Sequence, residues 1–274
     1  MAATASKTLD ILFFGDLVGK PGRVAVRRYL ASLAPDCRPD VVIANGENVT
    51  HGFGLSEKHY HELLAMGVDI ITGGNHSWDR PDILHYVERA ERFVRPDNLP
   101  AATPGVGHRV IEVHGFRIGV INLIGQAFMG NYNSPWERLE RVVQTLKAQT
   151  PILFLDFHAE ATAEKIAMAH YCADLGVSAM AGTHTHVQTA DERVLKGVMG
   201  FITDAGFNGA HDSVIGMDAE SSLMRLKSAL PARLQVAMTP TLQVNAARFR
   251  VEIASGRCVG VSRTFQLLDP LPAG

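Results

Sequence analysis

Five short apolar runs, each ending in a polar turn that contains glycine or histidine, place the strongest limit on how this chain can fold. They cover residues 11–14, 41–44, 68–72, 152–155 and 177–181. Short apolar runs bounded by turn residues are typical of buried strands. Because helical segments follow the turns, the strands are expected to pair in parallel with right-handed crossovers. The chain is therefore predicted to have an α/β fold.

Helix signals follow these turns at regular places. Pro21 suits the first turn of a helix, Ser56 suits an N-cap, and Ser134 followed by Pro135 begins a capping-box helix. Thr162 can cap a helix that stops at Gly176. The predicted helices cover residues 22–33, 56–66, 81–92, 135–148 and 162–176.

Two further segments have the pattern of hairpins. Residues 109–113 and 116–123 flank a His114-Gly115 turn, and residues 242–254 and 257–267 flank a Ser255-Gly256 turn. A short strand is also expected over 201–204. Together with the parallel strands, these hairpins favour a two-sheet β-sandwich flanked by helices. Residues 8–270 are expected to form a single domain, preceded by a disordered segment over 1–7.

Composition excludes several classes of function. The chain has 274 residues, 46% of them hydrophobic, and a formal net charge of -2. This balance gives no signal for nucleic acid or a membrane surface, and no run is long enough to span a bilayer. The first residues lack a signal-peptide pattern, and Cys37, Cys172 and Cys258 are odd in number and far apart. A cytoplasmic protein with reduced cysteines is expected.

The strongest functional signal is Gly182-Thr183-His184-Thr185-His186, directly after an apolar run. Two histidines in a tight loop can hold a metal ion, although two loop histidines in water are the alternative. Other candidate ligands follow the other strands: Asp16, Glu47, Asn48, Asn75, His76 and His158. Because ligands of open α/β sheets bind at the carboxyl ends of the strands, we expect these side chains to share one metal site.

The types of ligand indicate the type of site. Carboxylate, amide and imidazole groups without thiolate suit manganese, iron or zinc in a hydrolytic centre. The set is large enough for two divalent ions, and Glu47 can bridge them. Two ions bring roughly +4, which Asp16, Glu47 and a bridging hydroxide reduce to about +1. Such a site favours a phosphoryl substrate and activates water at neutral pH.

Each candidate also has a purely structural interpretation. Asp16 could cap a helix, Glu47 and Asn48 could be turn residues, Asn75 could hold a left-handed turn, and His158 could be a buried core histidine. The remaining histidines are read as having no role at the site. His51 and His211 are exceptions worth testing, because their glycine-rich loops could reach substrate, and Phe53 and Asn131 could line a pocket. The sequence does not identify the substrate-binding residues.

The ordered motifs Gly15-Asp16, Gly46-Glu47-Asn48, Gly74-Asn75-His76, His158 and Gly182–His186 resemble those of calcineurin-like metallophosphoesterases. The match is to their YmdB-like branch of cyclic-nucleotide phosphodiesterases. The resemblance implies the αββα metallophosphoesterase fold. It implies that one metal is held by Asp16, Glu47 and His186, and the other by Glu47, Asn75, His158 and His184. His76 would be the general acid that protonates the leaving oxygen.

One position departs from the general family pattern. Most of the superfamily has Asp-x-His in the first motif, whereas Val18 stands where that histidine would be. Asn48 is the expected replacement, through its amide oxygen. Together, the composition, the types of ligand and the resemblance predict a cytoplasmic hydrolase with two divalent ions, iron or manganese first and zinc next.

The substrate that the resemblance implies is a 2′,3′-cyclic nucleotide such as 2′,3′-cyclic AMP, attacked by a metal-bridging hydroxide. Two alternatives stay open. One is a phosphomonoesterase with the same metals, and the other is a non-catalytic regulator that binds metal or nucleotide. Another phosphodiester could replace the cyclic nucleotide, and a homo-oligomer is compatible with the edge hairpins.

Overall fold

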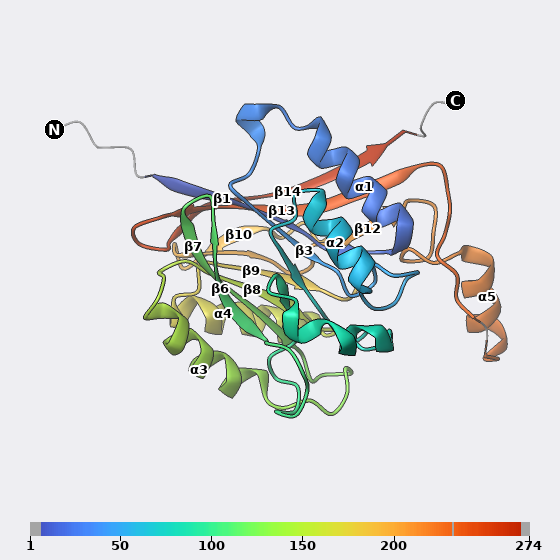
Figure 1. Cartoon of the computed structure of the whole chain (residues 1–274), viewed down its shortest axis with the longest axis horizontal. Helices are drawn as coiled ribbons and strands as arrows, with labels where there is room; N and C mark the ends of the chain where they lie inside the picture. The colour runs from blue at the N-terminus through green and yellow to red at the C-terminus, as the bar shows by residue number, and fades with distance from the viewer. Residues whose placement is uncertain (1–6, 232, 270–274) are drawn as a thin grey trace.

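The computed structural model describes residues 7–231 and 233–269, and it has two β-sheets stacked face to face with helices on both outer faces (Figure 1). The predicted α/β class and the two-sheet sandwich are confirmed. The expected disordered segment 1–7 lies outside the described residues except for Lys7, whose carbonyl oxygen accepts a hydrogen bond from the Ile253 N–H at 3.0 Å. No helix in the described residues is long and apolar enough to cross a bilayer.

The first sheet has the strand order β2-β12-β13-β1-β3-β4-β5, with β14 also paired to β13. Its strands are β1 (Thr8–Phe14), β2 (Asp16–Leu17), β3 (Val41–Asn45), β4 (Ile70–Thr72), β5 (Phe93–Val94), β12 (Phe207–Ala210), β13 (Leu242–Glu252) and β14 (Cys258–Leu268). Strands β1, β3 and β4 pair in parallel, as predicted, and β5, which was not predicted, pairs in parallel with β4. The predicted tail hairpin is β13 and β14, which pair antiparallel.

The second sheet has the strand order β10-β11-β9-β8-β7-β6. Its strands are β6 (His108–Val113), β7 (Phe116–Ile124), β8 (Leu153–His158), β9 (Ala179–Thr183), β10 (Arg193–Leu195) and β11 (Met199–Ile202). The four central strands are parallel, and the predicted hairpin β6-β7 forms one edge. Strand β11 corresponds to the short strand expected over 201–204.

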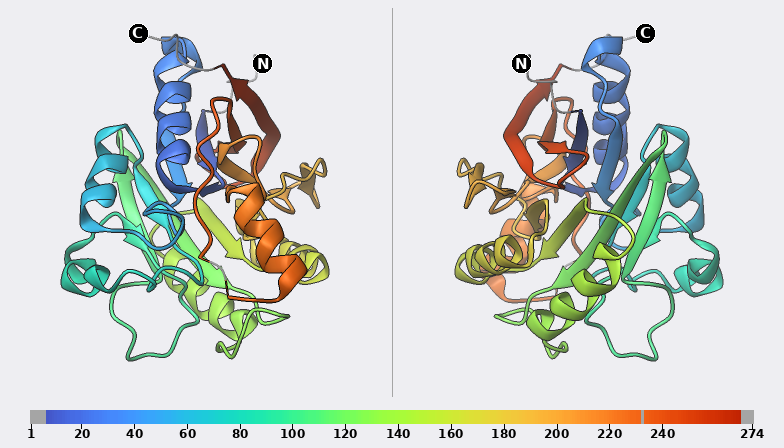
Figure 2. Two further views of the ribbon diagram at one scale, coloured as in Figure 1. Left: turned by 90° about the vertical axis from the view of Figure 1, so that its right-hand side faces the viewer. Right: turned by 90° about the vertical axis from the view of Figure 1, so that its left-hand side faces the viewer.

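Helices cover both outer faces of the sandwich. Helices α1 (Gly19–Ser32) and α2 (Glu57–Ala65) share a core with the first sheet, and α3 (Pro135–Lys147) and α4 (Thr162–Leu175) share one with the second. Helix α5 (Ala219–Ser228) lies at the periphery, apart from the two layers in Figure 1 and nearest the viewer in the left view of Figure 2. Ser56 and Ser134 cap α2 and α3 as predicted, because each hydroxyl accepts a backbone N–H from the first turn.

Three helix predictions need correction. Residues 81–92 form two short 3₁₀ helices, η2 (Pro81–His85) and η3 (Val87–Arg89), because the Tyr86 hydroxyl donates to Leu55 O at 2.6 Å and the Tyr86 backbone has φ -131°. Thr162 is the first residue of α4 and Ala161 is its N-cap. Helix α1 begins at Gly19, earlier than residue 22.

The alternation of side chains along the strands builds the core. In β1, Leu9, Ile11 and Phe13 face the second sheet, whereas Leu12 and Phe14 face α1 and α2. In β8, Phe154 faces the space between the sheets. Leu153, Leu155 and Phe157 face α3 and α4. The same alternation places Asp156 and His158 between the sheets.

A polar layer replaces the apolar core at the carboxyl ends of the parallel strands. Asn45, Thr72 and Thr183 all donate hydrogen bonds to the buried carboxylate of Asp156, at 2.9, 2.5 and 2.7 Å. Asn45 and Thr72 belong to the first sheet, whereas Thr183 and Asp156 belong to the second. This layer therefore links the two sheets directly below the candidate ligands.

Candidate metal centre

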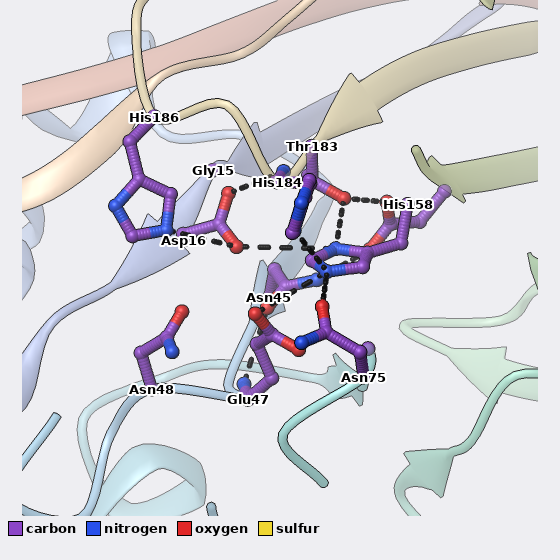
Figure 3. A network of polar contacts seen from close by, with 12 residues as sticks. Gly15, Asp16, Asn45, Glu47, Asn48, Asn75, His158, Thr183, His184 and His186 are labelled. Carbon is purple, nitrogen blue, oxygen red and sulfur yellow. Dashed lines mark hydrogen bonds and ion pairs between the residues drawn. The ribbon is translucent and has the colours of Figure 1, made fainter. Parts of the chain in front are cut away.

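The predicted ligands come from both sheets, and their side chains lie close together (Figure 3). Asp16 begins β2, and Glu47 and Asn48 follow β3. His158 is the last residue of β8, and His184 and His186 follow β9. The structure thus brings together side chains that are far apart in the sequence, as expected for loops at the carboxyl ends of parallel strands.

Two groups of potential metal ligands share Glu47. Ligand atoms of Glu47, His158 and His184 lie within 4.8 Å of one another, and those of Asp16, Glu47 and His186 do the same. Asn75 adds an amide oxygen to the first group, since its Oδ1 is 2.8 Å from His158 Nε2. The arrangement has the composition of two adjacent cation sites with a common carboxylate.

The centre has the features of a site built for cations. Asp16 Oδ1 and Asn48 Oδ1 are buried, and neither has a hydrogen-bond partner among the described residues. A buried oxygen without a partner is costly unless it ligates an ion. At Gly74, an added Cβ would lie 2.1 Å from Glu47 Oε2 and 2.6 Å from His158 Nε2, so only glycine leaves this space free. The residues present therefore fit divalent ions.

Buried carboxylates and histidines at the centre shift the pKa values of one another. Burial disfavours the charged form of Glu47, yet the neighbouring His158 and His76 lower its pKa to about 2. Burial also disfavours the charged form of His158, but Glu47 and Asp16 raise its pKa to about 9. Burial, with the nearby His158, lowers the pKa of His184 to about 3. Divalent ions would compete with the proton of His158 for the same electron pair.

Asp156 and Thr183 hold His158 in a defined orientation. The Thr183 hydroxyl donates to Asp156 Oδ1 at 2.7 Å, so its oxygen accepts from His158 Nδ1–H at 2.9 Å. Nε2 is then the nitrogen that faces Glu47, 3.3 Å from Oε1. Burial raises the pKa of Asp156 to about 6. This chain of hydrogen bonds is the outer support that metal-binding histidines usually have.

The loop that carries His184 and His186 is strained and anchored. Both histidines have positive φ, at 96° and 66°, which is uncommon for residues other than glycine. Between them, the Thr185 hydroxyl donates to Asp204 Oδ2 at 2.6 Å, and the buried Lys165 Nζ donates to the same oxygen at 2.6 Å. This anchor fixes the loop so that both rings point into the centre (Figure 3).

His76 lies beside the centre and is held by its neighbours. Its backbone N–H donates to Glu47 Oε2 at 3.0 Å, and its ring Nδ1 is 2.8 Å from Asp79 Oδ2. The Phe53 ring packs edge to face against it, with centroids 5.0 Å apart. These contacts leave Nε2 as the ring nitrogen without a protein partner among the described residues. His76 therefore lies beside Glu47 with its ring Nε2 available to a ligand.

Comparison with protein families identifies the chain. Residues 12–264 match the family model of the YmdB-like proteins. The chain belongs to the YmdB-like family. The 2′,3′-cyclic-nucleotide 2′-phosphodiesterase of Bacillus subtilis strain 168 is 44% identical to this chain over 229 residues, covering 84% of this chain and 86% of that protein. The resemblance seen in the sequence motifs is confirmed.

Solved structures show the same fold. A hypothetical protein from Thermus thermophilus superposes with a TM-score of 0.87 at 35% identity, covering 96% of this chain and 100% of that chain. A novel phosphatase from Mycoplasma pneumoniae gives a TM-score of 0.88 at 32% identity, covering 97% and 95%. A 5′-nucleotidase precursor from Thermus thermophilus, at 14% identity and a TM-score of 0.53, covers 96% and 55% and shares the fold alone. The predicted metallophosphoesterase fold is confirmed.

In this YmdB-like chain, the position of the missing first-motif histidine is apolar. Val18 is fully buried against Phe207 and Met217. Asn48 donates through Nδ2 to Gly52 O at 3.1 Å, which leaves its Oδ1 unpaired among the described residues. Figure 3 shows this amide on the side of Asp16 and His186. That placement supports the prediction that Asn48 supplies the replacing oxygen.

Several supporting residues escaped the sequence analysis. Asp79 follows His76 by three positions, a spacing that a search for histidine partners could have used. Asp156 precedes His158 by two positions in a strand, so the alternation of side chains could have placed it on the same face. The carbonyl oxygen of Ile215, 2.8 Å from His186 Nδ1, carries no side-chain signal at all.

Proposed function

We propose that this chain is a metal-dependent phosphodiesterase that hydrolyses 2′,3′-cyclic nucleotides, such as 2′,3′-cyclic AMP, at a centre of two ions. The observation that carries the proposal is the pair of ligand groups that share Glu47. The activity in the name of the Bacillus subtilis relative supports the substrate class. Hydrolysis of a phosphodiester is the reaction for which such a shared-carboxylate centre is suited.

The proposed ligands divide between two sites. Asp16, Glu47, Asn48 and His186 would hold one ion, and Glu47, Asn75, His158 and His184 would hold the other. Bound iron or manganese, or zinc as the next choice, would supply positive charge to the phosphoryl oxygens and an activated water. The lack of thiolate ligands at the centre supports this choice of metals.

The chain's own residues would then do three things. Gly74 would keep the space between Glu47 and His158 open, because a Cβ there would lie 2.1 Å from Glu47 Oε2 and 2.6 Å from His158 Nε2. His76 would give its Nε2 proton to the departing ribose oxygen, while Asp79 holds Nδ1. One water is consumed, the P–O2′ bond breaks, and the product is a 3′-phosphate with a free 2′-hydroxyl. Negative charge builds up on the phosphoryl oxygens during the reaction, and fixed positive groups stabilise this charge most strongly where water is excluded.

Cellular location and assembly belong to the same proposal. All three cysteines are unpaired in the structure, which is compatible with a reducing cytoplasm. Among the described residues, the long edge strand β14 pairs with no strand other than β13, and beyond Cys258, whose N–H donates to Val198 O at 2.8 Å, its outer side is the proposed edge for pairing between copies in a homo-oligomer.

Hydrolysis assays on metal-stripped protein test this function. The protein is resupplied with manganese and given 2′,3′-cyclic AMP beside a simple phosphomonoester such as p-nitrophenyl phosphate. We expect manganese-dependent turnover of the cyclic diester, with 3′-AMP as product, and little turnover of the monoester. Turnover of the monoester alone would instead assign a phosphatase with the same centre. Metal binding without turnover of either compound would assign a non-catalytic metal- or nucleotide-binding regulator.

A further inference from the structure

A basic pocket lies next to the candidate metal centre. It has a volume of about 890 Å³, and its walls include Arg80, Arg225, Arg233, His51 and Phe53. We call it the arginine pocket. No carboxylate lines it among the residues that the structure describes. Three guanidinium groups without an acidic partner in the wall make this a site for anions.

The arginine pocket shares a wall with the centre. Phe53 lines the pocket and packs against the ring of His76, at 5.0 Å between centroids. The carbonyl oxygen of Gly52 accepts a hydrogen bond from Asn48 Nδ2 at 3.1 Å. A ligand whose reacting phosphate sits at the metals can therefore extend past His76 into the arginine pocket.

Arg80 is fixed in place before any ligand binds. Its Nε donates to Phe53 O and its Nη2 donates to Thr50 O, both at 3.3 Å. Gly54, with φ 73°, lies so close that an added Cβ would be 2.6 Å from Arg80 Cγ. Such anchoring reduces the entropy that an arginine loses when it binds an anion.

The other side of the arginine pocket is formed by Arg225 and Arg233, which are far from Arg80 in the sequence. Arg225 belongs to α5, and Arg233 lies in the segment that returns from it towards β13. Val236 in this segment is in close contact with the 50–54 loop, because a Cβ on Gly52 would lie 3.0 Å from its Cγ2. Arg225 and Arg233 are both exposed, so they are free to meet a ligand.

A cyclic mononucleotide has no partner for these arginines. It carries one negative charge, on the cyclic phosphate, and that charge would be at the metal centre. We propose that the arginine pocket binds a second phosphate group, on the 5′ side of the nucleoside that bears the 2′,3′-cyclic phosphate. Phe53 would stack against the base, as aromatic side chains do with unpaired bases. The proposal rests on the proposed function and narrows its substrate class.

The chemistry of the ligand points to its source. A 2′,3′-cyclic phosphate forms at the 3′ end of an RNA when the 2′-hydroxyl attacks the adjacent phosphodiester and the next nucleoside leaves as a 5′-hydroxyl. The preferred substrate would thus be an oligoribonucleotide end, or a 5′-phosphorylated cyclic mononucleotide, rather than a free cyclic nucleoside phosphate. Both contain the second phosphate that the arginine pocket requires.

Competing substrates test the proposal in the metal-loaded enzyme. We would compare kcat/KM for adenosine 2′,3′-cyclic phosphate, its 5′-phosphorylated form, and the dinucleotide ApA with a terminal 2′,3′-cyclic phosphate. We expect kcat/KM for at least one of the last two to exceed the first by about tenfold or more, the effect of one good charge-assisted contact. A preference for the 5′-phosphorylated mononucleotide alone would identify that source, and equal values for all three would overturn the proposal.

Two arginine substitutions then locate the effect. In Arg225→Ala and Arg233→Ala, the preference for the substrate with the second phosphate should fall about tenfold, with the change mainly in KM. Arg141→Ala on α3 removes the same charge outside the arginine pocket and should keep the wild-type preference. A preference that survives in both pocket variants would overturn the assignment to this pocket.

A binding measurement tests the phosphate site in the arginine pocket independently of the proposed reaction. The product dinucleotide ApA with a terminal 3′-phosphate and 3′-AMP can be compared by calorimetry, which needs no turnover. We expect the dinucleotide to bind about tenfold more tightly, and the difference to shrink in Arg225→Ala and at high salt. Equal affinities would contradict the binding of a second phosphate in the arginine pocket but would leave the proposed reaction standing. Tighter binding of the dinucleotide without turnover of any cyclic substrate would contradict the proposed reaction but would leave the phosphate site in the arginine pocket standing.

Discussion

Three histidines at the centre have one ring nitrogen occupied by a protein partner. The Nδ1 atoms of His158, His186 and His76 lie 2.9, 2.8 and 2.8 Å from Thr183 Oγ1, Ile215 O and Asp79 Oδ2. In neutral His158 and His186, a proton fixed on Nδ1 leaves the electron pair on Nε2 for a metal ion. His76 as a proton donor requires the imidazolium form, in which Asp79 accepts from Nδ1–H and Nε2 carries the proton to be given. The protein thereby sets, before metal or substrate binds, which nitrogen faces the reacting groups.

Substitution of His76 tests its role as proton donor. In His76→Ala, we expect both metal ions to stay bound and kcat to fall by about 10²–10⁴-fold, the usual contribution of a general acid. Metal content and steady-state turnover are measured on the same preparation. His85→Ala, which removes an exposed histidine from η2, is the control and should retain full activity. Unchanged turnover in His76→Ala would remove His76 from the mechanism.

Thr183→Val tests the outer support of His158. Valine has nearly the shape of threonine but cannot join His158 to Asp156, so the ring loses its orienting partner. We expect metal affinity to fall by about 10–100-fold, as measured by titration with a metal-sensitive dye. Thr183→Ser keeps the hydroxyl and should bind metal nearly as tightly as the wild type. Equal affinities for the valine and serine variants would contradict this role.

At the scale of the elements, the sequence predicts the parallel strands well because their side chains carry the signal. Runs such as 41–44 are apolar on both faces, and the ligands at their carboxyl ends must lie together once the strands are parallel. The two-residue strands β2 and β5 have no such signal, since neighbouring strands define them. The 3₁₀ turns near Tyr86 depend on a contact with Leu55, 31 positions away, which no local pattern reveals.

Helix α2 offers a test of pH dependence through His59. Burial and the nearby Arg23 lower the pKa of His59 from 6.5 to about 4. Between these two pKa values the unfolded chain binds more protons than the folded chain, so the free energy of unfolding rises with pH in this range. The contribution of neutral His59 to that free energy is lost as pH falls towards about 4. In chelator-treated protein, urea unfolding should show a steeper loss between pH 6.5 and about 4.5 for the wild type than for His59→Gln. Parallel curves would contradict the buried neutral state.

At the scale of the whole molecule, the candidate metal ligands come from both sheets. Asp16 and Glu47 extend from the first sheet, and His158 and His184 extend from the second. Bound ions would add links between the layers, beside the hydrogen bonds of Asp156. The sequence could place these ligands at one edge, but it could not show the arginine pocket. That pocket is assembled from the 50–54 loop, Arg80 and the chain around α5.

Metal should therefore stabilise the fold as a whole. An ion that binds only the folded chain adds about 2.7 kcal/mol when its free concentration is about a hundred times Kd. We expect a chelator to lower the melting temperature of the wild type and readdition of manganese to restore it. Asp16→Asn removes one charged ligand with little change in shape, and its melting temperature should respond much less to metal. An equal response in Asp16→Asn would argue against Asp16 as a ligand.

The central claim is that two ions bound around Glu47 support hydrolysis of a 2′,3′-cyclic nucleotide. The most direct measurement is a titration of metal-stripped protein with manganese, in which bound metal and turnover of 2′,3′-cyclic AMP are followed together. We predict that turnover appears with metal and reaches its plateau at about two ions per chain. Full turnover in the chelated protein, or a plateau at one ion, would contradict the account.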